Sequence, residues 1–229
     1  MKPRVIVHMV SSLDGKIELS RWSEVPGLAR EALVEAYEEI HRKLEGDAWI
    51  VGRTTMAEFA DGKPSLATTA EPVPRVTHRA GSGPRYAVAL DRSGKLNWAT
   101  NTANGDHVIE VLTEQVSDAY LSGLRATSVS YLFAGAEEID LDLMLEKLHD
   151  EFGIKRLLLE GGGHINGSFA TAGLVDELSL VLAPVIDGFS GATTVFEHED
   201  ASARSNGLAL VAIERLPSDL VWLRYERRR

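Results

Sequence analysis

The chain contains no cysteine, and this absence removes several kinds of chemistry at once. Without cysteine there is no disulfide bond, no thiolate nucleophile and no zinc site built on Cys ligands. The seven histidines show no ligand spacing such as His-Glu-x-x-His, so we expect no metal site. A chain without disulfides fits a reducing compartment, and we expect a cytoplasmic protein.

The sequence also lacks long apolar runs and an excess of positive charge. No stretch reaches the roughly 18 apolar residues of a membrane span, and the opening MKPRVIVHMV is too short a run for a signal peptide. The formal net charge of -10 opposes non-specific binding to nucleic acid or an anionic membrane. We therefore expect neither as a partner.

What is present is an alternation of short apolar runs with amphipathic segments. Strands are expected at residues 4–10, 48–52, 85–91, 106–113, 129–135, 154–159, 177–186 and 220–226. Helices are expected at residues 27–46, 53–60, 141–153 and 166–173, and a long loop at residues 61–84. This order predicts an α/β fold with a mainly parallel sheet and helices on both faces. The last strands lack a helix between them, which indicates a mixed sheet with an antiparallel end.

A glycine run follows one of these strands, in LLLEGGGHINGSF at residues 157–169. Gly161, Gly162 and Gly163 stand between a buried strand and a possible helix start, directly after Glu160. In open α/β sheets ligands bind beyond the carboxyl ends of strands, where glycine lets a phosphate reach the backbone and a helix N-terminus. A tight turn that needs glycine only for its geometry is the alternative.

A second strand ends similarly in IVGRTTM, at residues 50–56. Gly52 is followed by Arg53, Thr54 and Thr55 at a possible helix start. Hydroxyl and N–H groups there suit a phosphate, and an arginine suits a 2′-phosphate. Helix capping by one of the threonines, with a surface arginine, is the alternative.

A third strand ends in ALDRSGK, at residues 89–95. Asp91 closes the strand, and Ser93 and Gly94 turn the chain away from it. An ordinary turn is the alternative. Three such turns on one sheet edge point to a nucleotide site more strongly than each does separately.

Together these motifs resemble a known family. SSLDGKI, VGRTTM, DGKPSL, LLLEGGGHINGSF and GLVDELSLVLAPVIDG are similar to segments in the reductase domain of bifunctional riboflavin-biosynthesis deaminase-reductases. They are also similar to the stand-alone relatives of that domain, which share the dihydrofolate-reductase fold. The resemblance covers residues 4 to 225 and implies a single reductase domain over residues 1–229. The zinc deaminase domain of the bifunctional enzymes is absent, since a chain without cysteine cannot supply its P-C-x-x-C site.

The resemblance implies NADPH as the hydride donor and a phosphorylated ribosylamino-pyrimidine as the substrate. The sugar would be reduced at C1 to an open-chain ribityl group. By position, the cofactor-binding residues would be Gly52, Arg53, Thr54, Thr55, Gly161, Gly162 and Gly163, with Asp91, Ser93 and Gly94 near the adenosine end. The substrate side would comprise His8, Ser12, Asp14, Lys16 and Trp22. Asp61 and Glu160 would be the candidate catalytic acids.

Some of these residues have plainer interpretations. His8 stands where the family usually has lysine, and a buried, hydrogen-bonded histidine is its alternative role. Glu160 can pair with Lys155 or Arg156, and Asp14 can serve only as a turn former. Trp22 can stack on the substrate ring or simply pack in the core.

Two other functions stay open beside the pyrimidine reductase. One is a dihydrofolate or pterin reductase, and the other is a nucleotide-binding accessory protein that has lost its chemistry. Relatives in the resembled family commonly form homodimers, and we expect the apolar strand at residues 177–186 to contribute to such an interface.

Overall fold

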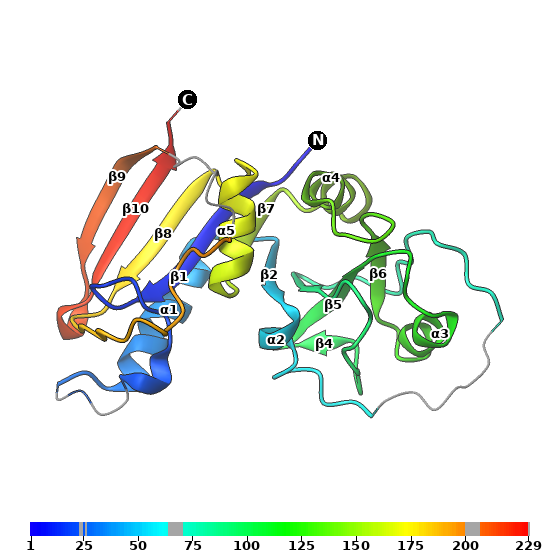
Figure 1. Cartoon of the computed structure of the whole chain (residues 1–229), viewed down its shortest axis with the longest axis horizontal. Coiled ribbons are helices and arrows are strands. Elements are labelled where there is room, and N and C mark those ends of the chain that lie inside the picture. The colour runs from blue at the N-terminus through cyan, green and yellow to red at the C-terminus, as the bar shows by residue number, and fades with distance from the viewer. Residues whose placement is uncertain (23–24, 26, 64–70, 200–206, 229) are drawn as a thin grey trace. The chain divides into compact units, whose positions relative to one another are not determined.

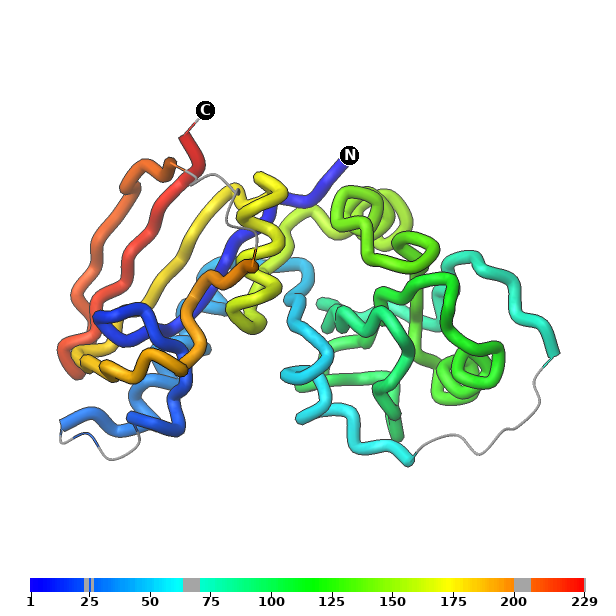
Figure 2. Tube along the Cα trace, viewed as in Figure 1, coloured from blue at the N-terminus to red at the C-terminus, as the bar shows by residue number. Residues whose placement is uncertain are grey.

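The structure is a computed structural model of the 229-residue chain, and it describes residues 1–22, 25, 27–63, 71–199 and 207–228. The chain divides into two compact units, which are described separately (Figure 1). Unit 1 comprises Met1–Pro3 and Asp47–Leu157, and unit 2 comprises Arg4–Gly46 and Leu158–Arg229. Figure 2 shows that the middle of the chain, cyan to green, forms unit 1, whereas both ends contribute to unit 2. The expectation of one reductase domain over residues 1–229 stays a prediction.

Unit 1 is built on parallel strands. They are β2 (Ala48–Gly52), β3 (Tyr86–Leu90), β5 (Asp106–Leu112) and β6 (Ser130–Phe133), with the short β4 (Thr102–Ala103) antiparallel to β5. β3 pairs in parallel with β2 and β5, and β5 pairs in parallel with β6. Val88 of β3 is fully buried between Ile50 and Ile109, its partners on either side. Such continuous apolar strands suit a parallel sheet that is covered on both faces.

Helices α2 (Arg53–Met56), α3 (Asp118–Ala126) and α4 (Leu141–Phe152) complete unit 1. Helices α3 and α4 pack near β6. The Ser117 side chain caps α3 by accepting from the Tyr120 N–H, and Asp140 caps α4 by accepting from the Leu143 N–H. Helix α4 ends at Gly153, whose φ of 74° is left-handed and favours glycine. Helix α3 was not predicted from the sequence.

Unit 2 has a mixed arrangement of strands. They are β1 (Arg4–Ser11), β8 (Glu177–Leu182), β10 (Val221–Arg227) and β9 (Leu208–Arg215). β1 and β8 are parallel, whereas β10 is antiparallel to both β8 and β9. The predicted antiparallel end of the sheet is confirmed. Strand β9 was not predicted.

Helices α1 (Arg30–Lys43) and α5 (Gly163–Thr171) belong to unit 2, with short 3-10 helices at Leu19–Arg21 and Pro217–Asp219. Helix α1 packs near β1 and buries Leu33, Ile40 and His41. Strand β7 (Arg156–Leu159) spans the boundary, with residues 156–157 in unit 1 and 158–159 in unit 2.

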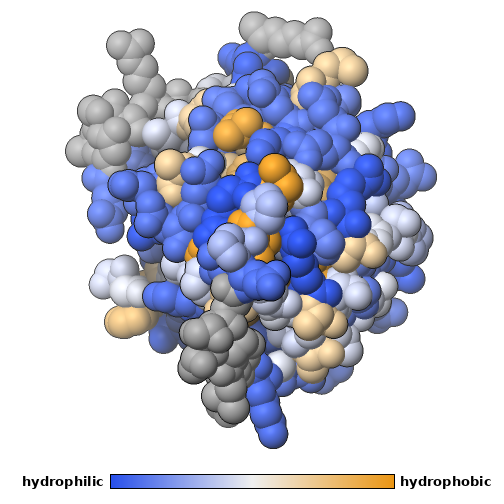
Figure 3. Space-filling model, turned by 90° about the vertical axis from the view of Figure 1, so that its right-hand side faces the viewer, coloured by the Kyte–Doolittle hydropathy of each residue, from blue (hydrophilic) through white to orange (hydrophobic). Residues whose placement is uncertain are grey.

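The predicted mixed α/β class, with mainly parallel strands, is confirmed. The helices found in the described ranges are all too short or too polar to cross a membrane. The face of the molecule in Figure 3 is largely hydrophilic and carries only small hydrophobic spots.

Candidate functional site

Two glycines of the turn after β7 lie in different environments, one buried and one exposed. Gly163 is buried, and a Cβ on it would lie 2.3 Å from the Thr194 carbonyl oxygen, so this position serves close packing. Gly162 is exposed, with a φ of 53°, and a Cβ on it would meet no atom within 4 Å. It precedes α5, whose first turn contains no acidic residue. The open backbone at Gly162 and the helix N-terminus beside it suit a phosphate.

Glu160, directly before these glycines, is held by two residues of α1. Its Oε1 lies 2.7 Å from the His41 Nδ1, and the two side chains are only 9% and 11% exposed. The Tyr37 hydroxyl faces the same carboxyl group. Burial and the charge of Glu160 raise the pKa of Tyr37 well above its usual value, so Tyr37 stays a neutral hydrogen-bonding group. The structure pairs Glu160 with His41, and a pairing with Lys155 or Arg156 stays a prediction.

His8 belongs to the core of unit 2. It is fully buried, with Nδ1 3.1 Å from the Ser179 Oγ and Nε2 3.2 Å from the Tyr37 carbonyl oxygen. Its ring stacks on Tyr37 at 4.2 Å between centroids. Burial lowers the pKa of His8, which favours the neutral imidazole. This burial fits the buried, hydrogen-bonded alternative for His8, and a direct substrate contact stays a prediction.

The SLDGK turn is tied to a distant loop of the same unit. The Asp14 carboxylate accepts from the Ser12 hydroxyl at 2.6 Å and from the N–H groups of Asp187 and Gly188 at 3.0 and 2.8 Å. These donors lower the pKa of Asp14, with the Ser12 hydroxyl contributing most. The Lys16 ammonium donates to the Ala192 carbonyl at 2.8 Å. Asp14 is therefore a turn former with long-range contacts, and a role of this turn toward substrate stays a prediction.

Trp22 packs inside unit 2. Its side chain is 1% exposed, and its indole N–H donates to the Asp187 Oδ2 at 3.0 Å. Arg21 contacts the same carboxylate and lowers the pKa of Asp187. This is the packing alternative of the sequence analysis, and it leaves Trp22 no open face for stacking on a substrate.

In unit 1, the end of β2 carries the second predicted phosphate site. Gly52 is the N-cap of α2 and no side chain caps this helix, so the threonine-capping alternative is wrong. Arg53 and Thr54 are exposed and Thr55 is half-buried. No residue in the described part of the chain forms an ion pair with Arg53. The exposed arginine and threonine suit an anionic group.

The third predicted turn behaves as an ordinary turn. Asp91 is fully buried, and its Oδ2 accepts from the backbone N–H groups of Lys95 and Leu96. Gly94 has a φ of 63°, and a Cβ there would lie 2.7 Å from the Tyr120 ring. The Asp91 side chain therefore stabilises this turn, and a contact with the cofactor stays a prediction. Of the three residues expected near the adenosine end, Asp91, Ser93 and Gly94, only Ser93 is exposed.

The two candidate acids lie in different units. Asp61, in unit 1, is exposed in a segment without helix or strand, whereas Glu160 is in unit 2. Part of the loop expected at residues 61–84, namely residues 64–70, lies outside the described residues.

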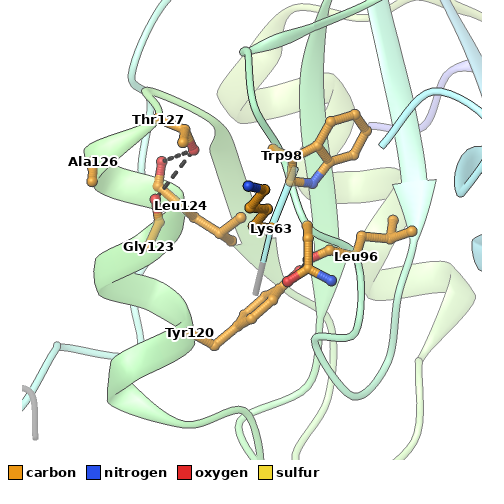
Figure 4. Close-up of a pocket in the computed structure, with 9 residues that line it drawn as sticks. Lys63, Leu96, Trp98, Tyr120, Gly123, Leu124, Ala126 and Thr127 are labelled. Carbon is orange, nitrogen blue, oxygen red and sulfur yellow. Dashed lines mark hydrogen bonds between the residues drawn. The ribbon is translucent and has the colours of Figure 1, made fainter. Parts of the chain in front are cut away.

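A cavity of about 200 Å³ lies beside α3 in unit 1 (Figure 4). Figure 4 shows Lys63 lying between α3 and residues 96–98. The lining residues are Lys63, Leu96, Asn97, Trp98, Tyr120, Gly123, Leu124, Ala126 and Thr127. Behind it, Glu110 is fully buried and accepts from the Trp98 indole N–H. Searching the described residues finds no group of three or more His, Asp or Glu arranged to hold a metal ion.

The sequence analysis missed Tyr37 and His41. Both fall on the apolar stripe of the helix expected at residues 27–46, spaced i and i+4. That spacing places them on one helix face, but nothing in it indicates that Glu160 is their partner.

Comparisons with known proteins identify a family and a fold for this chain. The family model described as RibD C-terminal domain matches residues 3–222. A 2,5-diamino-6-ribosylamino-4(3H)-pyrimidinone 5′-phosphate reductase of Methanothermobacter thermautotrophicus is 32% identical over 212 residues, covering 92% of this chain and 91% of that protein. The fold is similar to that of a pyrimidine reductase-like protein from Corynebacterium diphtheriae, with a TM-score of 0.71 and 18% identity over 99% of this chain and 92% of that one. It is also similar to dihydrofolate reductase from Enterococcus faecalis, with a TM-score of 0.51 and 13% identity over 99% and 97% of the two chains.

Proposed function

Because this chain belongs to the RibD C-terminal domain family, we propose that it is a reductase of a ribosylamino-pyrimidine 5′-phosphate in riboflavin biosynthesis. The match over residues 3–222 carries the proposal, and the reductase of M. thermautotrophicus supports it along nearly its full length. The name of this relative gives the diamino-pyrimidinone phosphate as its own substrate. The deaminated counterpart, 5-amino-6-(5-phosphoribosylamino)uracil, is the second candidate.

NADPH is the cofactor that we assign to the reaction. Gly162 and the first turn of α5 offer an open backbone for a phosphate in unit 2. Arg53 and Thr54 offer exposed groups for a phosphate in unit 1. When bound, NADPH supplies the hydride. Each of these two strand ends, taken separately, therefore carries groups that fit a phosphate of the cofactor.

Glu160 is the acid that we assign to the proton needed by the substrate nitrogen. Its carboxyl group is 9% exposed, and it directly precedes the glycine turn. A largely buried acid at a strand end can hold a proton close to a ligand and keep bulk water away. Asp61 stays the alternative acid, and its exposed position gives it less support.

We further propose a cytoplasmic homodimer with neither nucleic acid nor membrane as a partner. The strand expected at the interface, β8, is paired on both sides by β1 and β10, so its edges are not free. Strand β9 offers more exposed apolar surface, with Leu210, Val211 and Ile213 each at least 50% exposed. An interface at β9 would cover these side chains.

A substrate panel tests the proposed function. The purified chain is given NADPH with the diamino-pyrimidinone phosphate, its deaminated counterpart, or dihydrofolate, and NADPH consumption is followed by absorbance. We expect turnover with a phosphorylated pyrimidine and none with dihydrofolate. The Glu160→Gln variant should lose about 100-fold or more in kcat while retaining NADPH binding, because general acid catalysis is worth roughly 10² to 10⁴.

Turnover of dihydrofolate alone would instead support a pterin reductase. NADPH binding without turnover of any compound would support an accessory protein. Glu114→Gln is the control, because Glu114 is an exposed glutamate in unit 1.

A further inference from the structure

We infer that His41 is a positioning residue for the Glu160 carboxylate, a role that rests on the proposed function of Glu160. The imidazole of His41 fixes the orientation of the carboxyl group and supplies it with a hydrogen bond from inside unit 2. Helix α1 thereby takes part in the reaction without touching the substrate.

The contact between the two side chains is short and protected from water. Nδ1 of His41 lies 2.7 Å from Oε1 of Glu160, and neither side chain is more than 11% exposed. A partly buried carboxyl group that loses a hydrogen-bond partner pays a desolvation cost with no compensating contact. The carboxyl group would then rotate or take up a proton.

His41 is itself held in place by its helix. It lies in the last turn of α1 and belongs to the buried stripe of that helix, with Leu33 and Ile40. Its place on this buried stripe holds the imidazole inside unit 2, with Nδ1 directed at the carboxyl group of Glu160.

Tyr37, which lies one turn before His41 on α1, is the second residue of this helix beside Glu160. Its hydroxyl faces Glu160, and its ring stacks on His8 with an interplanar angle of 13°. His8 is in turn fixed by Ser179, whose hydroxyl also accepts from the Trp222 indole N–H at 2.8 Å. The titratable groups that face Glu160 are thus His41 and Tyr37 from α1 and His8 from β1.

The contact with His41 sets the orientation of the Glu160 carboxyl group. Glu160 joins the strand end to residues 161–163, so rotation of its carboxyl group changes where the proton is presented relative to the glycine turn. A misplacement of about 1 Å can cost on the order of 100-fold in rate. Holding this carboxyl group is therefore a requirement for turnover, separate from substrate binding.

A double-mutant cycle tests the inference. His41→Leu removes the donor at similar size and should lower kcat about 10- to 100-fold, with KM changed less than about threefold. The double variant His41→Leu/Glu160→Gln should be no slower than Glu160→Gln alone, because His41 acts through Glu160. His41→Asn places an amide nitrogen near the position of Nδ1 and should recover part of the loss. His149→Leu, which removes an imidazole paired with the exposed Asp150 in unit 1, is the matched control.

A second readout does not depend on turnover. The titration of the Glu160 carboxyl carbon is followed by NMR in the wild type and in His41→Leu, with Glu160→Gln to assign the signal. We expect the midpoint to change when the imidazole is removed, because the carboxyl group loses its hydrogen bond with Nδ1 of His41. A purely structural role for His41 would lower thermal stability and leave this midpoint unchanged.

Two results would overturn the inference. One is an additive loss of kcat in the double variant, and the other is an unmoved carboxyl titration in His41→Leu. A wild type that reduces neither pyrimidine would refute the proposed function and the part of the inference that concerns turnover. The titration would still decide whether His41 controls Glu160.

Discussion

Glu110 should make the stability of unit 1 fall as pH rises above the acid range. Its side chain is fully buried in β5, and this burial raises the pKa of Glu110 to about 8. The negative charge of the nearby Asp91 also raises this pKa. Hydrogen bonds with the Trp98 indole and the Tyr120 hydroxyl lower this pKa, and burial outweighs them. The Trp98 indole donates to Oε1, the Tyr120 hydroxyl lies 2.8 Å from both carboxyl oxygens, and the same hydroxyl lies 3.0 Å from the Leu96 carbonyl. A proton on Glu110 can be donated to Tyr120, which then donates to Leu96, so every group is satisfied.

The sign of the effect follows from proton binding. The unfolded chain releases this proton near the ordinary value of 4.5, whereas the folded chain keeps it until about pH 8. Between these values the folded state binds more protons, so the free energy of unfolding falls with rising pH. At about 1.4 kcal/mol for each pH unit, the loss attributable to Glu110 across this window is roughly 4 to 5 kcal/mol.

The perturbation is Glu110→Gln, which mimics the protonated acid in shape and retains both a donor and an acceptor. Urea unfolding of the wild type and the variant is measured at several pH values from the acid range to above pH 8. The free energy of unfolding of the wild type minus that of the variant should fall as the pH rises from about 4.5 to about 8. Above about pH 8 this difference should level off. Buried histidines such as His8, whose lowered pKa gives the opposite slope, contribute equally to both proteins and cancel in the difference. Parallel pH profiles for the two proteins would refute the argument, because they would mean that folded Glu110 is ionised throughout.

Other predictions concern the cofactor and the glycine turn. Arg53→Ala should reduce the preference for NADPH over NADH by ~1.5–3 kcal/mol, measured by calorimetric titration, and an unchanged ratio would mean that another group reads the 2′-phosphate. Gly163→Ala should destabilise unit 2 by about 1–3 kcal/mol in urea unfolding, because its Cβ would lie 2.3 Å from the Thr194 oxygen. Gly162→Ala should weaken NADPH binding at a smaller cost in stability of about 1–2 kcal/mol, since only its φ of 53° opposes the change. Equal NADPH affinity in Gly162→Ala and the wild type would show that the turn does not hold the phosphate.

The sequence predicted the buried strands well because burial on both faces leaves a continuous apolar run. Residues 48–52 were predicted with the bounds of β2, and residues 4–10 fall one short of β1. Strand β9 was missed although residues 208–213 form an apolar run of strand length, and most of its side chains are exposed instead of buried. Helix α3 was missed although Ser117 caps it, because a nine-residue helix gives only a short stripe, with Leu121 and Leu124 as its buried residues.

The site was harder to predict, because its decisive contacts join residues that are far apart along the chain. Glu160 and His41 are 119 positions apart, and Asp14 and Asp187 are 173 apart. Local patterns identified Glu160 and Asp14 as polar residues beside turns but could not indicate their partners. The burial of His8 and Trp22 depends in the same way on tertiary packing, so their substrate roles followed from the resemblance and not from the residues themselves.

The measurement that tests the central claim most directly follows the transferred hydrogen. NADPH deuterated at the reactive carbon of the nicotinamide is incubated with the protein and the diamino-pyrimidinone phosphate, and the product is analysed by NMR and mass spectrometry. The account predicts deuterium on the former C1 of the sugar, in an open-chain ribityl product, with consumption of one NADPH for each product formed. Deuterium on the heterocycle, or no transfer while NADPH still binds, would contradict it.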